Sequence, residues 1–204
     1  MAFLGDIKSF DRSSLSSAET IVTKHNGRKI KESVSGEELS LNCPELDDAC
    51  FSEFFVFDAS PDKNLHKVCK GLFIGSQDAS ANLEELQASG ITHILNVAVY
   101  TENHYPKLFT YKNVSMYDVP SYDISEHFED CSKFIENAIT SNGSVLCHCN
   151  AGISRSSTVI MAYLMKYKNM TLDDALELVQ KARPIAMPNI GFLVKLQEYG
   201  LKLK

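Results

Sequence analysis

The chain has 204 residues, of which 44% are hydrophobic, and its formal net charge is −6 at pH 7. This length suits one domain with an appendage, the apolar fraction is enough for a real core, and the acidic balance does not favour a nucleic-acid partner. No apolar run approaches a membrane span or a signal-peptide core, so we expect no membrane association. The six cysteines show no paired framework, which indicates the cytoplasm, with the nucleus as a second compartment.

The first 64 residues differ from the rest of the chain. They are rich in serine, acidic residues outnumber basic ones, and apolar residues are scattered except within Phe51–Phe57. We interpret 1–64 as an extension that is partly disordered or docked through this aromatic patch. The stretch 28–31, Arg-Lys-Ile-Lys, resembles a basic-plus-hydrophobic docking peptide, although a solvated stretch is the simpler interpretation. Residues 65–204 are predicted to form the main folded domain.

From residue 67 onward, apolar residues recur with the periodicity of strands and helices. The expected strands are two short ones within 68–74, around Lys70-Gly71, followed by 91–97, 110–116 and 144–148. The expected helices are 82–89, one opening at Asp123 or Ser125 and running to about 140, 155–167, 171–182 and 189–201. Gly90 closes the first helix, and Thr171 with Asp174 forms a near capping box. Alternating strands and helices predict an α/β domain in layers.

One short segment, 145–160, carries most of the chemical information. It places Cys149, Gly152 and Arg155 between a β-rich run and a helix-forming run. A loop that joins a strand to a helix start directs backbone N–H groups and the positive end of the helix dipole into one hollow, which favours an anion. The Arg155 guanidinium matches phosphate geometry, and the same field stabilises a thiolate at Cys149. The segment therefore predicts a phosphate cradle with a nucleophile at its floor.

A structural cysteine and a zinc site are the two alternatives to the cradle. Cys149 could be a buried structural cysteine before a capped helix. Cys147, His148 and Cys149 could also be zinc ligands, although neighbouring positions on a strand do not easily surround a tetrahedral ion, and no second pair follows at finger spacing. The pattern in this loop fixes five positions and is therefore specific, so the anion cradle is favoured over both alternatives.

Residues 148–156 resemble the signature loop of the cysteine-dependent protein tyrosine phosphatases. The stretch 67–203 is similar to the dual-specificity phosphatase domain, on the segments 71–76, 92–97, Asp123-Ile124 with Phe128, and 182–189 with Phe192. The chain has no tryptophan, so it lacks the Trp-Pro-Asp acid loop of classical tyrosine phosphatases. Residues 1–64 are too few for a rhodanese-like kinase-binding domain, which indicates a small, atypical member. The resemblance implies a three-layer α/β fold with a central mixed β-sheet flanked by helices.

The resemblance also implies a reaction through a phospho-cysteine, with no metal and no cofactor. Cys149 is then the nucleophile, and Arg155 with the loop amides binds the phosphate oxygens. The phosphate-binding positions are Asn150, Ala151, Gly152, Ile153, Ser154 and Arg155. Gly152 is expected to permit a close backbone approach or a positive φ.

The remaining roles follow from the same resemblance. Asp118, after the strand 110–116, occupies the place of the family's general acid, and Asp123 is the rival, although its position suits a helix N-cap. His148 is expected to hydrogen-bond near the thiolate, and Ser156 to donate to the sulfur. Asn189 and Asn96 are expected to brace the loop from behind.

The expected function is hydrolysis of phosphotyrosine and phosphoserine or phosphothreonine. The partner is a phosphoprotein, and the resemblance points to a protein kinase of stress or mitogen-activated signalling. A non-catalytic scaffold that binds such a kinase is the alternative from another class. A phosphoinositide or RNA phosphatase is a lesser option, because positions 150, 151, 153 and 154 carry no Lys or Arg for a multiply charged head group.

Overall fold

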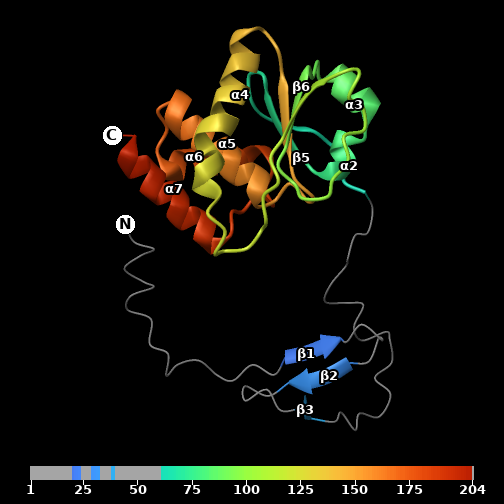
Figure 1. Ribbon diagram of the computed structural model, residues 1–204, viewed down its shortest axis with the longest axis vertical. Helices are drawn as coiled ribbons and strands as arrows, with labels where there is room; N and C mark the ends of the chain where they lie inside the picture. The colour runs from blue at the N-terminus through green and yellow to red at the C-terminus, as the bar shows by residue number, and fades with distance from the viewer. Residues whose placement is uncertain (1–19, 24–28, 33–37, 40–60, 204) are drawn as a thin grey trace. The chain divides into compact units, whose positions relative to one another are not determined.

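Figure 1 shows the computed structural model, which describes the backbone of residues 20–23, 29–32 and 38–39 and the whole of 61–203. The chain divides into two units, Met1–Asp58 and Ala59–Lys204. Residues 61–64, which the sequence assigned to the extension, therefore belong to the second unit, and the predicted boundary after residue 64 stays a prediction.

The first unit contains a small antiparallel sheet, in the order β1-β2-β3. Its strands are β1 (Thr20–Thr23), β2 (Lys29–Glu32) and β3 (Glu38–Leu39). The sequence did not predict these strands. The candidate docking stretch 28–31 overlaps β2, and the aromatic patch Phe51–Phe57 lies outside the described residues.

The second unit is built on a mixed five-stranded sheet, in the order β4-β5-β8-β6-β7. Its strands are β4 (His66–Cys69), β5 (Leu72–Gly75), β6 (His93–Asn96), β7 (Thr110–Asn113) and β8 (Val145–His148). Only β4, at one edge, runs antiparallel to its neighbour, and the other pairs are parallel. The carboxyl ends of β5, β6 and β8 therefore meet at one edge of the sheet, where α/β folds place their ligands.

The helices of this unit follow the sequence expectation closely. They are α2 (Gln77–Ser80), α3 (Leu83–Ala88), the 3-10 helix η2 (Ile124–His127), α4 (Phe128–Thr140), α5 (Arg155–Tyr167), α6 (Leu172–Ala182) and α7 (Ile190–Lys202). The side chains of Asn82, Thr171 and Asn189 cap α3, α6 and α7, and Thr171 with Asp174 completes the capping box.

Side chains alternate between two cores, one on each face of the sheet. Leu72 and Ile74 of β5 belong to the larger core, which α4 to α7 cover, whereas Phe73 belongs to the smaller core with Leu86 of α3. Figure 1 shows α4 to α7 gathered on one side of the strands and α2 and α3 on the other. The predicted three-layer α/β architecture with a mixed central sheet is confirmed.

Three local expectations need correction. Strand β7 ends at Asn113 rather than near 116, the segment after Asp123 begins as the 3-10 helix η2, and the four-residue α2 was not predicted. All three involve elements of only four residues, for which sequence periodicity carries little signal. Within the described residues, no helix has the length and hydropathy needed to cross a bilayer.

Candidate active site

The signature loop, residues 148–156, connects the end of β8 to the start of α5. Gly152 sits at φ +67°, and a Cβ there would lie 2.5 Å from the carbonyl oxygen of Gly75. Both reasons that the sequence gave for a glycine, positive φ and close backbone approach, therefore hold at Gly152. The backbone N–H groups of 150–155 donate no hydrogen bond to another described residue, so they stay free for an anion at the N-terminus of α5.

Cys149 lies at the floor of this loop, with 1% of its surface exposed. Its Sγ is 3.4 Å from the Oγ of Ser156, a residue buried in the first turn of α5. If Cys149 is a thiolate, the Ser156 hydroxyl is the donor in this contact. The structure therefore brings together the predicted nucleophile and the predicted sulfur partner.

Arg155 lies across the opposite side of the loop. Its Nη2 donates to Oδ1 of Asn150 at 2.8 Å, its Nη1 to the carbonyl of Met116 at 3.3 Å, and its Nε to Oδ2 of Asp118 at 3.3 Å. Each of the three guanidinium nitrogens thus has one partner, which fixes the fork beside the cradle and leaves further N–H groups for a ligand. Asp118 supplies the counter-charge in this arrangement.

Asp118 accepts from three donors, two of them in the signature loop. Besides Arg155, its Oδ1 accepts from the Ser154 hydroxyl at 2.7 Å and from Nδ2 of Asn189 at 2.9 Å. The rival Asp123 instead accepts hydrogen bonds from Ser125 as the N-cap of η2, and these bonds lower the pKa of Asp123. Of the two acidic candidates, Asp118 is therefore the one that the structure places against the cradle.

His148 is completely buried at the end of β8. Its Nδ1 lies 3.3 Å from the carbonyl oxygen of Cys149, and its Nε2 has no partner among the described residues. Burial lowers the pKa of His148 to about 4, so the imidazole is neutral near pH 7 and donates through Nδ1–H. His148 thus holds the backbone of the nucleophile rather than its sulfur.

The two asparagines predicted to brace the loop behave differently. Asn189 touches it directly, because its backbone N–H donates to the Ser154 hydroxyl at 3.2 Å while its side chain reaches Asp118. Asn96 instead holds the following loop, accepting from the Ala98 N–H at 3.0 Å and donating to the Thr101 carbonyl at 3.1 Å. Its side chain makes no hydrogen bond to the signature loop among the described residues, so the bracing expected of Asn96 is not direct.

Comparison with known proteins decides the family. A family profile described as "Dual specificity phosphatase, catalytic domain" matches residues 72–202. The chain belongs to the dual specificity phosphatase family. It is 39% identical over 194 residues to dual specificity protein phosphatase 19 of Mus musculus, which covers 95% of this chain and 87% of that protein.

Two further comparisons extend this result for the phosphatase. MAP kinase phosphatase with leucine-rich repeats protein 3 of Dictyostelium discoideum is 47% identical over 138 residues, which are 67% of this chain and 16% of that protein. The solved structure of human tyrosine phosphatase-like serine/threonine/tyrosine-interacting protein has a TM-score of 0.64 at 34% identity, covering 68% of this chain and 96% of that one. The expected dual-specificity family and fold are confirmed.

Sequence reasoning missed one residue at the site of this phosphatase, Arg183. The residue follows α6, is 2% exposed, and donates to the carbonyl oxygens of Gly152 at 2.8 Å and Ala151 at 2.7 Å. The motif around Arg183 was part of the family resemblance, but an arginine before a proline gives no sign of burial. Its carboxylate partner, Asp62, lies far away in the sequence.

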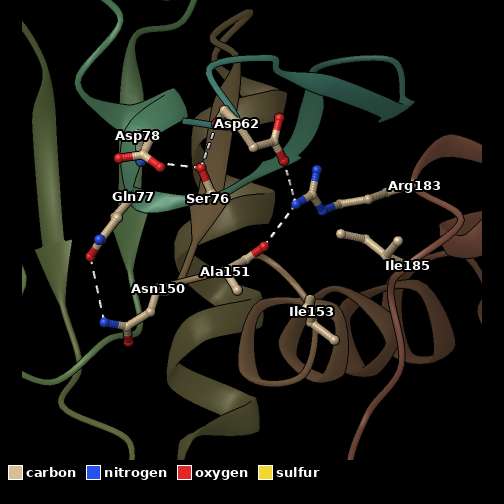
Figure 2. Close-up of a pocket in the computed structure, with 9 residues that line it drawn as sticks. All are labelled: Asp62, Ser76, Gln77, Asp78, Asn150, Ala151, Ile153, Arg183 and Ile185. Atoms are coloured by element: carbon tan, nitrogen blue, oxygen red, sulfur yellow. Dashed lines mark hydrogen bonds and ion pairs between the residues drawn. The ribbon is translucent and has the colours of Figure 1, made fainter. Parts of the chain in front are cut away.

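A depression of about 360 Å³ adjoins the signature loop of the phosphatase (Figure 2). It is lined by Asp62, Ser76, Gln77, Asp78, Asn150, Ala151, Ile153, Arg183 and Ile185. Figure 2 shows the Arg183 guanidinium between Asp62 and the carbonyl of Ala151. Within the described residues, no group of three or more His, Cys, Asp or Glu side chains is arranged to hold a metal ion.

Proposed function

We propose that this protein is an active phosphatase that hydrolyses phosphotyrosine, phosphoserine and phosphothreonine in proteins. The observation that carries the proposal is the grouping of the site residues at one loop. The Cys149 sulfur contacts Ser156, the N–H groups of 150–155 have no acceptor among the described residues, and the Arg155 guanidinium contacts Asn150 of the same loop and Asp118. Together they supply the nucleophile, charge stabilisation and proton that phosphoester cleavage needs.

In the first step, the Cys149 thiolate attacks the phosphorus of the substrate. A sulfur–phosphorus bond forms, the ester bond breaks, and the leaving oxygen takes the proton of the Asp118 carboxyl. The loop N–H groups and Arg155 hold the equatorial oxygens throughout, where charge develops in the transition state. The Ser156 hydroxyl, at 3.4 Å from Sγ, donates to the sulfur while it carries negative charge.

In the second step, water attacks the phospho-cysteine. The Asp118 carboxylate now accepts a proton from the water, the sulfur–phosphorus bond breaks, and inorganic phosphate leaves with the thiolate restored. The loop N–H groups, the side chains of Cys149, Arg155 and Asp118, and one water account for every charge and proton in this cycle, so we propose that it runs without a metal ion or another cofactor. A nucleophilic cysteine has to stay reduced, which suits the cytoplasm or the nucleus.

The proposed substrate is a phosphorylated protein kinase of stress or mitogen-activated signalling. The support is the similarity to the Dictyostelium relative, which is named a MAP kinase phosphatase. A phosphoinositide is disfavoured because Arg155 is the only cation among residues 150–155, and a multiply charged head group would favour more.

Turnover of p-nitrophenyl phosphate and of matched phosphotyrosine and phosphothreonine peptides tests the proposal. Cys149→Ser should abolish turnover yet retain phosphopeptide binding, because a hydroxyl leaves the cradle intact but is a far weaker nucleophile. Cys69→Ser, at a partly exposed cysteine in β4, is the matched control and should keep full activity. If Cys149→Ser retained more than a few per cent of activity, the covalent mechanism would be wrong.

The second candidate function is a scaffold that binds phosphoproteins without turnover. It is favoured by the likeness to a solved protein whose name is tyrosine phosphatase-like interacting protein. Acid-quenching the wild-type protein during turnover of a radiolabelled phosphopeptide separates the two. Label trapped on the Cys149 peptide supports the enzyme, whereas tight phosphopeptide binding with neither label nor phosphate release supports the scaffold.

A further inference from the structure

Arg183 holds the outer side of the signature loop. For the N–H groups of such a loop to face an anion, some of its carbonyls must face the other way, and those of Ala151 and Gly152 point to Arg183. A Cβ at Gly152 would also lie 3.0 Å from the Nε of Arg183, so the guanidinium packs closely against the backbone of Gly152. The position of Arg183 therefore bears directly on the orientation of the loop amides.

A buried guanidinium needs an opposite charge, because an unpaired buried charge is strongly unfavourable. Arg183 is 2% exposed, and its Nη2 pairs with Oδ2 of Asp62 at 2.6 Å (Figure 2). Within the described residues, Asp62 is the only acidic side chain in ion-pair contact with Arg183. The C-terminal end of α6, which Arg183 caps, adds only a partial negative charge.

Asp62 is itself held in place by its neighbours. Its carbonyl oxygen accepts from the Ser76 hydroxyl at 2.6 Å, and the next carbonyl, that of Lys63, accepts from Nδ2 of Asn82 at 3.2 Å. Ser76 also caps α2, whose first residue, Gln77, donates its N–H to the carbonyl of Asn150 at 2.9 Å. The segment that contains Asp62 thus reaches the signature loop by two routes, through Arg183 and through α2.

We propose that Asp62 is a positioning residue for phosphate binding, acting through Arg183 on the carbonyls of Ala151 and Gly152. Asp62 lies before residues 72–202, the part of the chain that the family profile matches. The orientation of the phosphate-binding amides therefore depends on a side chain outside the matched domain. This inference rests on the proposed function, because it concerns the same phosphate cradle.

A positioning role and a purely electrostatic role for Asp62 predict opposite changes in anion affinity when the charge of Asp62 is removed. If Asp62 acted only through its electric field, Asp62→Asn would remove a negative charge near the cradle and tighten anion binding. If Asp62 positions the loop, Asp62→Asn and Asp62→Ala disturb Arg183 and weaken anion binding. Asp78→Asn is the matched control. Asp78 lines the same depression, and its carboxylate forms no ion pair or hydrogen bond among the described residues.

The experiment measures orthovanadate binding by calorimetry and p-nitrophenyl phosphate kinetics on the full-length chain, well below the melting temperature of each variant. We expect Asp62→Ala to weaken vanadate binding and raise KM on the order of tenfold, the usual consequence of losing one charge-assisted hydrogen bond, with a smaller change in kcat. Asp62→Glu should restore much of the affinity, and Asp78→Asn should leave affinity and KM at wild-type values.

Unchanged vanadate affinity in folded Asp62→Ala, with only a lowered melting temperature, would reduce Asp62 to a structural residue and overturn the proposal. Tighter binding in Asp62→Asn would overturn it in favour of the purely electrostatic role. If Asp62→Ala does not fold, the vanadate affinities of Asp62→Asn and Asp62→Glu decide instead: weaker binding in Asp62→Asn than in Asp62→Glu supports the positioning role. Vanadate binding requires no turnover, so an inactive wild-type protein would refute the proposed function while the role of Asp62 is still measured.

Discussion

The buried histidine before the nucleophile should make the stability of this phosphatase depend on pH. His148 has a pKa of about 4 in the folded protein, mainly because burial disfavours the imidazolium, whereas an exposed histidine titrates near 6.5. Between these two values the unfolded chain binds a proton that the folded protein does not. Stability from this residue is therefore complete above about pH 6.5 and is lost as the pH falls toward 4.

The size of the effect follows from the two pKa values. Integrating the proton linkage from pH 7.5 to pH 5.0 gives a loss of about 2 kcal/mol for His148 alone, and about 3 kcal/mol when the loss is complete. Carboxylates elsewhere add their own acid destabilisation, so the wild-type curve by itself does not isolate this residue. Comparison with a variant that cannot titrate at position 148 isolates the contribution of His148.

The assay is urea unfolding at pH 7.5 and pH 5.0 for the wild type and His148→Asn. Asparagine places an amide N–H near the position of Nδ1 and can still donate to the Cys149 carbonyl, but it has no proton to gain. We expect the wild type to lose about 2 kcal/mol more than the variant over this range. Any cavity left by the smaller side chain lowers stability at both pH values and cancels in the difference.

His148→Gln provides the control for this comparison. Its amide is displaced relative to that of asparagine, so its stability should differ from that of His148→Asn at any single pH. Its response to pH should nevertheless be the same, because it also lacks a titrating ring. An equal loss of stability in the wild type and both variants would show that His148 is not held neutral by burial.

Three further predictions concern the cradle. Asp118→Asn should lower turnover of phenyl and alkyl phosphates by roughly 100-fold, and that of an ester with a very acidic leaving group much less; equal losses would contradict the assignment of the acid. Arg155→Lys should lower kcat/KM for p-nitrophenyl phosphate severely, because a point charge cannot replace the fork, and near-normal kinetics would exclude Arg155 from the phosphate site. The fragment 59–204 should bind vanadate as the full chain does, whereas 67–204, which lacks Asp62, should bind it more weakly; equal affinities would count against Asp62.

Much of the second unit was predictable because its signals are local. Asn82 and Gly90 mark the two ends of α3, the Thr171 capping box starts α6, and α5 spans 155–167 as the periodicity indicated. The phosphate cradle stays a prediction, but it could be made from the sequence because Cys149, Gly152 and Arg155 all lie in one short segment. Short-range order of this kind depends on caps and turn residues that the sequence displays directly.

The parts that were missed depend on contacts between distant segments. Nothing local indicates that Ser154, predicted to bind phosphate, turns its hydroxyl to Asp118, or that Arg183 is buried with Asp62 as its counter-charge. Both contacts depend on how loops at the edge of the sheet pack together. Asn96 is a different case, because its side chain holds the loop directly after its own strand through Ala98 and Thr101, which are near in the sequence.

In the proposed mechanism, the contact between Arg155 and Asp118 couples phosphate binding to acid catalysis. In the structure, Asp118 accepts from Arg155, Ser154 and Asn189, so its carboxylate fills the place of an anion beside the guanidinium. A phosphate dianion carries more charge and more acceptor oxygens than one carboxylate, and it competes for the same fork. We propose that its arrival displaces the Asp118 carboxylate from Arg155, after which the carboxylate takes up a proton from water and gives it to the leaving ester oxygen. Under this proposal, substrate binding and release of Asp118 are one event, and a loop without phosphate keeps Asp118 paired with Arg155.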